Sequence, residues 1–268
     1  MSSYGLGAGG GSPLYVHAFA STIARIDQRF NYLGENLVPG ADSAKLGDMS
    51  RTSIHLVRHG EVFNPQGVLY GRLPEFHLSE LGRQMAGRAA DYFETRRSDG
   101  ANLVHLVASP LTRAQETAAP IAAALGLEIT TDERILEATN RFEGLSGVTS
   151  RLRNPRYWPL MHNPFKPSWG EPYADQVERV MAAVTDARLR ALELGGDNAE
   201  AILVSHQLPI WVTRLAAEGR RLWHDPRNRQ CTLTSVTTLD FDGDTLTGVR
   251  YEEPSADLLP GAANIPGA

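Results

Sequence analysis

The tripeptide Arg58-His59-Gly60 combines a cation, an imidazole and a glycine directly after an apolar run at residues 53–57. A guanidinium can bind two phosphate oxygens at once, and a neutral imidazole can act as a nucleophile. Glycine has no side chain, so the main chain at Gly60 can approach a bound group closely. Together, these three residue types suit phosphate binding and attack on phosphorus.

Two further segments supply residues that the same chemistry needs. Arg113 stands about one turn inside a predicted helix that follows another apolar strand, and helix N-termini attract anions. His206 ends a third apolar run. Ligands of parallel sheets gather at the carboxyl ends of the strands. We therefore expect Arg113 and His206 to meet Arg58 and His59 around one phosphate group.

Phosphate transfer to an imidazole also needs a proton for the leaving alcohol. The segment 135–144 offers two carboxylates for this task, Glu137 and Glu143. The carboxylate that donates the proton can afterwards activate water against the phosphohistidine. His59 must be neutral to attack, so we expect its other nitrogen to donate to a backbone carbonyl and the charge of Arg58 to disfavour the imidazolium.

Alternating strands and helices must position these residues. The predicted strands are 53–57, 103–108, 128–130, 201–204, 233–241 and 245–251, and the predicted helices are 79–97, 110–125, 174–194 and 208–218. Ser109-Pro110 predicts an N-cap followed by the first helical residue, and Asp242-Gly243 predicts a hairpin between the last two strands. Strands separated by helices indicate a three-layer α/β/α sandwich with a mostly parallel central sheet.

Composition excludes several classes of protein. The 268 residues carry a formal net charge of -5, which gives no general attraction to nucleic acid or to anionic membranes. No apolar run approaches the roughly 20 residues that span a bilayer. The single cysteine, Cys231, excludes an internal disulfide and is expected to be a small core residue. We expect a cytoplasmic protein with a small phosphorylated substrate, without cofactor or metal; the oligomeric state stays open.

The chain divides into three parts by composition. Residues 1–50 are predicted to be a flexible, non-catalytic N-terminal extension, 51–252 the catalytic domain, and 253–268 a flexible C-terminal tail. Helical spacing at 21–33 also allows a docked helix in the extension, and Met49 would be a natural start for the compact domain. The long segment 151–173, rich in proline and aromatic residues, is a candidate lid over the site.

The four segments together resemble the histidine phosphatase superfamily, also called phosphoglycerate mutase-like, from about Ser53 to Tyr251. The matching motifs are Arg58-His59-Gly60 with Asn64, the run Ser109–Thr117, and Val204-Ser-His206. The resemblance implies the fold predicted above. It also implies that His59 is the phosphorylated nucleophile, that Arg58, Arg113 and His206 form the phosphate pocket, and that Glu137 is the proton donor, with Glu143 second.

Three more residues are candidates for substrate binding. Asn64 fits the family motif, although asparagine before proline is also a common turn residue. Arg72 either reaches the substrate or is solvated. Gln207 follows His206 at a position where the family usually has glycine, and no aspartate stands there as it does in the acid-phosphatase branch.

The expected function is metal-independent hydrolysis of a small phosphomonoester through a phosphohistidine. The first alternative is a phosphoglycerate mutase, in which the phosphohistidine returns its phosphate to a sugar-acid phosphate. The second is a non-catalytic phospho-ligand binding protein, against which the retention of both histidines and both arginines argues. The physiological substrate cannot be read from residues that bind only phosphate.

Overall fold

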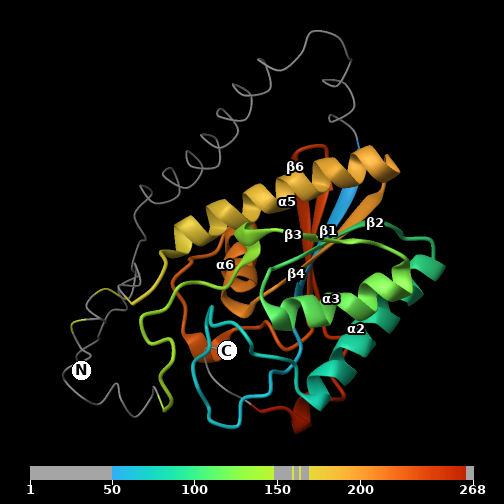
Figure 1. Cartoon of the computed structure of the whole chain (residues 1–268). Coiled ribbons are helices and arrows are strands. Elements are labelled where there is room, and N and C mark those ends of the chain that lie inside the picture. The colour runs from blue at the N-terminus through green and yellow to red at the C-terminus, as the bar shows by residue number, and fades with distance from the viewer. Residues whose placement is uncertain (1–49, 148–158, 160–162, 164–168, 264–268) are drawn as a thin grey trace, which may run out of the picture. The chain divides into compact units, whose positions relative to one another are not determined.

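Six strands form one central sheet in the computed structural model, which describes residues 50–147, 159, 163 and 169–263 (Figure 1). The strands are β1 (Arg51–Arg58), β2 (Asn102–Ala108), β3 (Ile129–Thr131), β4 (Ala199–Ser205), β5 (Val236–Asp242) and β6 (Thr245–Glu252). Their order across the sheet is β3-β2-β4-β1-β5-β6. The pairs among β3, β2, β4 and β1 are parallel, and β5 runs antiparallel to both of its neighbours. The expected mostly parallel sheet is confirmed.

Helices cover both faces of this sheet (Figure 1). They are α2 (Glu80–Ser98), α3 (Thr112–Leu125), α5 (Tyr173–Gly195) and α6 (Gln207–Ala217), with short 3-10 turns η2 (Glu133–Ile135), η4 (Pro226–Asn228) and η5 (Leu259–Gly261). Phe93 of α2 and Ile121 of α3 pack on one face, whereas Val184 of α5 and Ile210 of α6 pack on the other. The chain therefore has the predicted three-layer α/β/α architecture.

The two central strands explain how distant residues meet. Side chains of a strand alternate between faces, and in β1 Leu56 enters the core under α5 and α6 while Val57 enters the core under α2 and α3. Parallel pairing with β4 sets Arg58 opposite Ser205. Both strands end there, so the residues that follow, His59 and His206, leave the sheet at the same edge.

One predicted helix start is wrong. The helix α3 begins at Thr112 with Leu111 at its N-cap, not at Ser109-Pro110. The Ser109 hydroxyl is within hydrogen-bond distance of the His206 ring, with 2.7 Å between Oγ and Nε2. The predicted hairpin is confirmed, because Asp242 of β5 pairs with Thr245 of β6.

The described residues belong to one compact unit, Leu46–Ala268. Residues 1–49, with the predicted helix at 21–33, lie outside the described part of the chain. Beyond residue 252, Ser255 is buried and its hydroxyl donates to the Met85 carbonyl at 3.3 Å. The division into an extension, a catalytic domain and a tail stays a prediction.

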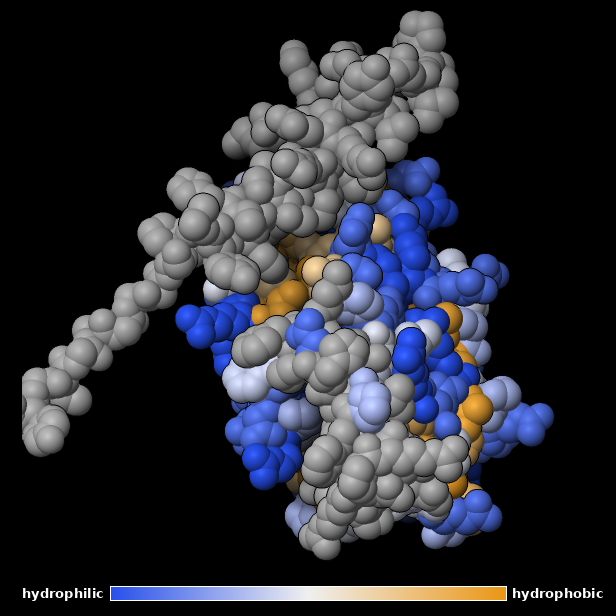
Figure 2. Space-filling model, turned by 90° about the vertical axis from the view of Figure 1, so that its left-hand side faces the viewer, coloured by the Kyte–Doolittle hydropathy of each residue, from blue (hydrophilic) through white to orange (hydrophobic). Residues whose placement is uncertain are grey.

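The face in Figure 2 is mainly polar outside its grey atoms, with smaller hydrophobic areas. Among the described residues, four large hydrophobic side chains are exposed: Phe63, Leu189, Leu194 and Trp223. Among the helices that the structure describes, not one combines the length and the hydropathy needed to cross a bilayer.

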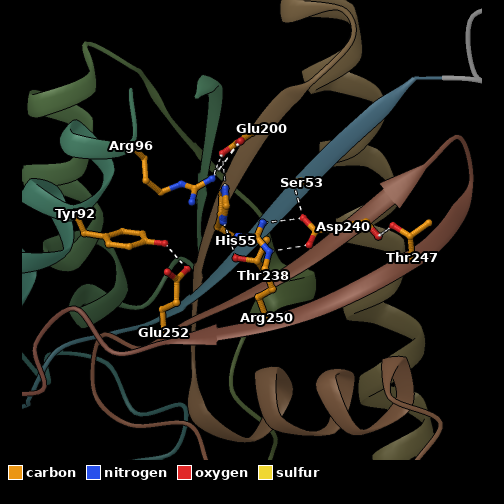
Figure 3. A network of polar contacts seen from close by, with 10 residues as sticks. All are labelled: Ser53, His55, Tyr92, Arg96, Glu200, Thr238, Asp240, Thr247, Arg250 and Glu252. Carbon is orange, nitrogen blue, oxygen red and sulfur yellow. Dashed lines mark hydrogen bonds and ion pairs between the residues drawn. The ribbon is translucent and has the colours of Figure 1, made fainter. Parts of the chain in front are cut away.

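A buried polar network crosses the sheet at the middle of β1, around His55 (Figure 3). His55 is fully buried, with 2.8 Å from its Nδ1 to Thr238 Oγ1 and 2.7 Å from its Nε2 to Glu200 Oε2. Arg96 of α2 donates to the same Glu200 carboxylate at 3.0 Å. Burial lowers the pKa of His55 in spite of its carboxylate partner. The network joins α2, β4, β1 and β5 without reaching His59.

The first turn of α2 packs unusually closely against the turn that follows His59. A Cβ added at Gly82 would lie 2.0 Å from the Glu61 carbonyl oxygen, and one at Gly60 would lie 2.6 Å from the Gly82 carbonyl oxygen. Real Cβ atoms do not approach backbone oxygens so closely. Glycine at these positions therefore allows the turn that carries His59 to rest on α2.

We expect Gly82→Ala to lower the free energy of unfolding by about 1–3 kcal/mol, since the added methyl group overpacks the backbone. Gly87→Ala in the same helix is the matched control. A Cβ there meets no described atom within 4 Å, so the change should raise the free energy of unfolding by up to about 1 kcal/mol. Urea unfolding of both variants measures this, and a Gly82→Ala protein as stable as wild type would contradict the packing argument.

Candidate active site

His59 is fully buried directly after β1, and both of its ring nitrogens have partners. Its Nδ1 lies 2.7 Å from the Gly60 carbonyl oxygen, which can only accept, so Nδ1 carries the proton. Arg113 donates from Nε to His59 Nε2 at 3.3 Å. The Nε2 atom therefore carries no proton, and its lone pair points towards the guanidinium. The expected carbonyl partner of the other nitrogen is confirmed.

The surroundings keep His59 neutral. Burial lowers its pKa well below the usual 6.5, and the charges of Arg113 and then Arg58 lower it further. The neighbouring Arg58 acts in the expected direction, and Arg113 contributes more. A neutral imidazole with one proton on Nδ1 has the form that a nucleophile needs.

Arg113 lies near the start of α3 with only 1 % of its surface exposed. Its guanidinium stacks 4.7 Å from the centre of the Tyr70 ring and donates from Nη2 to the Gly71 carbonyl at 2.5 Å. Thr117, one turn further along α3, accepts from the Gly60 amide at 3.1 Å. These contacts tie the first turn of α3 to the turn that carries His59.

Arg58 occupies the last position of β1 and is 6 % exposed. Its Nη1 donates to the Cys231 carbonyl at 2.7 Å, and its backbone amide donates to the Ser235 carbonyl at 3.1 Å. Cys231 itself is buried, as expected, and its carbonyl also accepts from Gln207 Nε2 at 3.3 Å. Arg58 is thus held by the segment that leads into β5.

His206 follows β4 and is fully buried, with its ring centre 5.2 Å from that of His59. Its Nε2 meets the Ser109 hydroxyl, whereas its Nδ1 has no hydrogen-bond partner among the described residues. Burial and then the charge of Arg113 lower its pKa well below 6.5. The structure therefore brings two neutral imidazoles together with the Arg113 guanidinium.

Glu137 follows the short turn η2 and is 7 % exposed. Its Oε1 accepts from the Ala138 amide at 2.8 Å. Burial lowers the pKa of Arg113, and the Glu137 charge opposes that effect, so the carboxylate acts on the same pocket. Glu143 lies beside Gly71, whose carbonyl accepts from Arg113. A Cβ added at Gly71 would lie 2.5 Å from Glu143 Oε2. Both candidate proton donors border Arg113.

The three remaining candidates are engaged within the chain. The Asn64 side chain bonds both backbone groups of Val68, at 2.8 and 3.1 Å, which is the contact of a turn residue. Arg72 donates from Nε to the Glu137 carbonyl at 2.5 Å. Gln207 accepts from Arg229 Nη1 at 3.3 Å. Their binding of substrate stays a prediction.

Two residues near the histidines were missed from the sequence. Ser109 was interpreted as a helix cap, although a polar residue at the carboxyl end of a parallel strand is itself a signal for a site. Tyr70, whose pKa burial raises to about 12, has its ring 6.4 Å from that of His59. Nothing in the sequence around Tyr70 marks it as a pocket residue.

Of the candidate lid at 151–173, the structure describes residues 159, 163 and 169–173, and the rest lies outside the described residues, so the lid stays a prediction. Within the described ranges, no cluster of three or more histidine, cysteine, aspartate or glutamate side chains is placed to hold a metal ion.

Solved structures share this architecture. The mycobacterial glucosyl-3-phosphoglycerate phosphatase Rv2419c is 24 % identical, with a TM-score of 0.61 over 76 % of this chain and 98 % of that chain. YhfR from Bacillus stearothermophilus is 27 % identical, with a TM-score of 0.57 over 73 % of this chain and 94 % of that chain. At these identities, the likeness to the mycobacterial enzyme shows the fold.

Sequence comparison finds a relative of higher identity than these solved structures. The uncharacterized protein Rv0525 of Mycobacterium tuberculosis (strain H37Rv) is 51 % identical over 207 residues, which are 76 % of this chain and 98 % of that protein. The profile of the histidine phosphatase superfamily (branch 1) matches residues 54–254, a range that contains both histidines and both arginines of the pocket. The chain belongs to the histidine phosphatase superfamily, branch 1, and is an enzyme of the phosphatase type.

Proposed function

We propose that this enzyme hydrolyses a small phosphomonoester without a metal ion, through a phosphohistidine at His59. The observation that carries the proposal is the contact of Arg113 with His59 Nε2, while Nδ1 donates to the Gly60 carbonyl. A nucleophilic nitrogen and a guanidinium that can bind the phosphate oxygens share one buried position.

In the first step, the lone pair of His59 Nε2 attacks phosphorus, and the bond from phosphorus to the ester oxygen breaks. Arg58 and Arg113 balance the negative charge of the phosphate oxygens from fixed positions, which costs no reorganisation during the reaction. Glu137 gives its proton to the departing alcohol oxygen. The products of this step are the free alcohol and a phosphohistidine.

In the second step, Glu137 takes a proton from water, whose oxygen attacks phosphorus while the bond from phosphorus to Nε2 breaks. Inorganic phosphate leaves, and His59 and Glu137 return to their starting protonation states. His206 would contribute a hydrogen bond to the phosphate. If Ser109 donates to Nε2, the remaining proton of His206 is on Nδ1, the nitrogen without a described partner.

The runner-up function is transfer of the phosphate to a sugar-acid phosphate instead of water. Solved neighbours whose names describe phosphatases support hydrolysis, among them a phosphoserine phosphatase of Entamoeba histolytica with 21 % identity and a TM-score of 0.59. Assay of 3-phosphoglycerate with and without its bisphosphate primer separates the two functions: primed isomerisation identifies a mutase, and release of inorganic phosphate identifies a phosphatase.

Purified protein is expected to release nitrophenol from p-nitrophenyl phosphate at the same rate with and without EDTA. Rapid quenching should trap a phosphoenzyme that is stable in alkali and labile in acid, as a phosphorus–nitrogen bond is. A phosphoenzyme with the opposite stability would contradict the histidine mechanism, and loss of activity in EDTA that added metal restores would contradict metal independence.

A further inference from the structure

In the part of the chain that the structure describes, the Glu171 carboxylate bonds to two arginines and to neither His59 nor His206. Arg179 of α5 donates to it twice, from Nε to Oε1 at 2.7 Å and from Nη2 to Oε2 at 3.0 Å. Arg72 donates from Nη2 to Oε2 at 3.1 Å. The Glu171 side chain is only 15 % exposed, so these charge-assisted bonds are largely shielded from solvent.

The same two arginines hold the backbone of the segment that carries Glu137. Arg72 donates from Nε to the Glu137 carbonyl, and Arg179 donates from Nη1 to the Arg134 carbonyl, both at 2.5 Å. The Glu171 amide adds a bond to the Thr139 carbonyl at 3.2 Å. We call Glu171, Arg72 and Arg179 the acid-segment clamp.

Glu137 needs such support because no helix or strand runs through its position. The turn η2 ends at Ile135, and the next regular contact is a single bridge between Asn140 and Gly170. At that bridge a Cβ on Gly170 would lie 2.4 Å from the Thr139 carbonyl oxygen, so the two backbones touch directly. Between these two points, the side chain of Arg72 holds the backbone of Glu137 itself.

We propose that Glu171 is a positioning residue that sets the general acid, acting on Glu137 through Arg72 and Arg179. The inference rests on the proposed function, in which Glu137 protonates the leaving group. A general acid must lie within about 2.6–3.2 Å of the atom that it protonates, and a displacement of about 1 Å can lower a rate about 100-fold. Replacement of the Glu171 carboxylate by an amide removes one of the two acceptor oxygens and the negative charge, which weakens both arginine contacts.

The test compares two leaving groups. Nitrophenolate leaves p-nitrophenyl phosphate without protonation, whereas the alkoxide of glycerol phosphate needs a proton from the acid. We expect Glu171→Gln to lower kcat/KM for glycerol phosphate by about 10- to 100-fold and that for p-nitrophenyl phosphate by less than about threefold. The value of kcat/KM is used because it reports the phosphorylation step, before the common phosphoenzyme is hydrolysed.

Glu200→Gln is the matched control. The Glu200 side chain is 14 % exposed and also binds two side chains, Arg96 and His55, but it lies at the start of β4, the end of the strand opposite His206. Figure 3 shows these contacts. The control should lower the urea midpoint without a preference between the two substrates. Arg72→Gln, which removes the contact with the Glu137 carbonyl directly, should reproduce the selectivity of Glu171→Gln.

Glu137→Gln separates failure of the inference from failure of the proposed function. If Glu137→Gln itself shows no preference between the leaving groups, the assignment of the acid is wrong. Suppose instead that Glu137→Gln lowers kcat/KM for glycerol phosphate more than for p-nitrophenyl phosphate, as the proposed function requires. If Glu171→Gln and Arg72→Gln then show no such preference, whether they lose activity on both substrates or keep it on both, the clamp has only a structural role. The inference is then overturned.

Discussion

Replacement of His59 by glutamine is expected to lower kcat/KM for p-nitrophenyl phosphate by about 10⁴- to 10⁶-fold, the range seen when a nucleophile is removed. Glutamine retains a group that can donate to the Gly60 carbonyl but offers no nucleophilic nitrogen at the position of Nε2. The phosphoenzyme should disappear together with turnover. Steady-state kinetics and quench trapping measure the two effects independently.

His55→Gln is the control for this variant. His55 lies in β1, is fully buried like His59, and has a pKa that burial lowers in the same direction. Its ring contacts Thr238 and Glu200 instead of the pocket (Figure 3). The variant should lose stability and keep its kcat/KM. Full activity in His59→Gln would remove the proposed nucleophile, and equal loss in both variants would point to a folding defect.

Replacement of Arg113 by glutamine is expected to lower kcat/KM by about 10³-fold, since a fixed guanidinium at a transferring phosphate contributes on this scale. It should also change the pH profile. Burial and the charge of Arg113 lower the pKa of His59, so removal of the charge raises that pKa towards its ordinary value. As the pH falls, the imidazolium then forms earlier, and activity is lost at a higher pH than in the wild type.

Arg188→Gln is the matched control for Arg113→Gln. Arg188 is also buried, lies 5.7 Å from the centre of the Phe241 ring and donates to the Gly243 carbonyl at 2.6 Å. Like Arg113, it is a buried guanidinium beside an aromatic ring, but its charged partner is Asp244, and none of its hydrogen bonds or ion pairs among the described residues involves His59. NMR titration of His59 should show the rise in pKa in Arg113→Gln alone. If Arg113→Gln lost activity at the same low pH as the wild type, the electrostatic role of Arg113 would be contradicted.

The strands could be predicted from the sequence because burial on both faces leaves a simple pattern. The apolar runs that form β1 and β4 end directly before His59 and His206. Their parallel order follows from the helices between them. The start of α3 could not be predicted from local pattern. Ser109 and Pro110 fit a helix start, but the Ser109 hydroxyl meets His206, a partner that only the folded sheet supplies.

The pocket residues at strand ends were predictable for the same reason, and those on irregular segments were not. Arg58, His59 and His206 stand where regular strands place them. Glu171 has no distinguishing neighbour in the sequence, and its importance arises from Arg72 and Arg179, which come from two separate elements. Which carboxylate approaches a bound substrate depends on the path of an irregular backbone, and no periodicity encodes that path.

Pairing of β1 with β4 has a consequence for the order in which the protein folds. The two strands are neighbours in the sheet, but β2, β3, α2, α3 and α5 separate them along the chain. Closing so long a loop costs conformational entropy before the two strands can form hydrogen bonds. Such non-local pairings therefore form slowly. We therefore expect helical content to recover early in renaturation and enzyme activity to recover later, because His59 and His206 meet only when β1 pairs with β4.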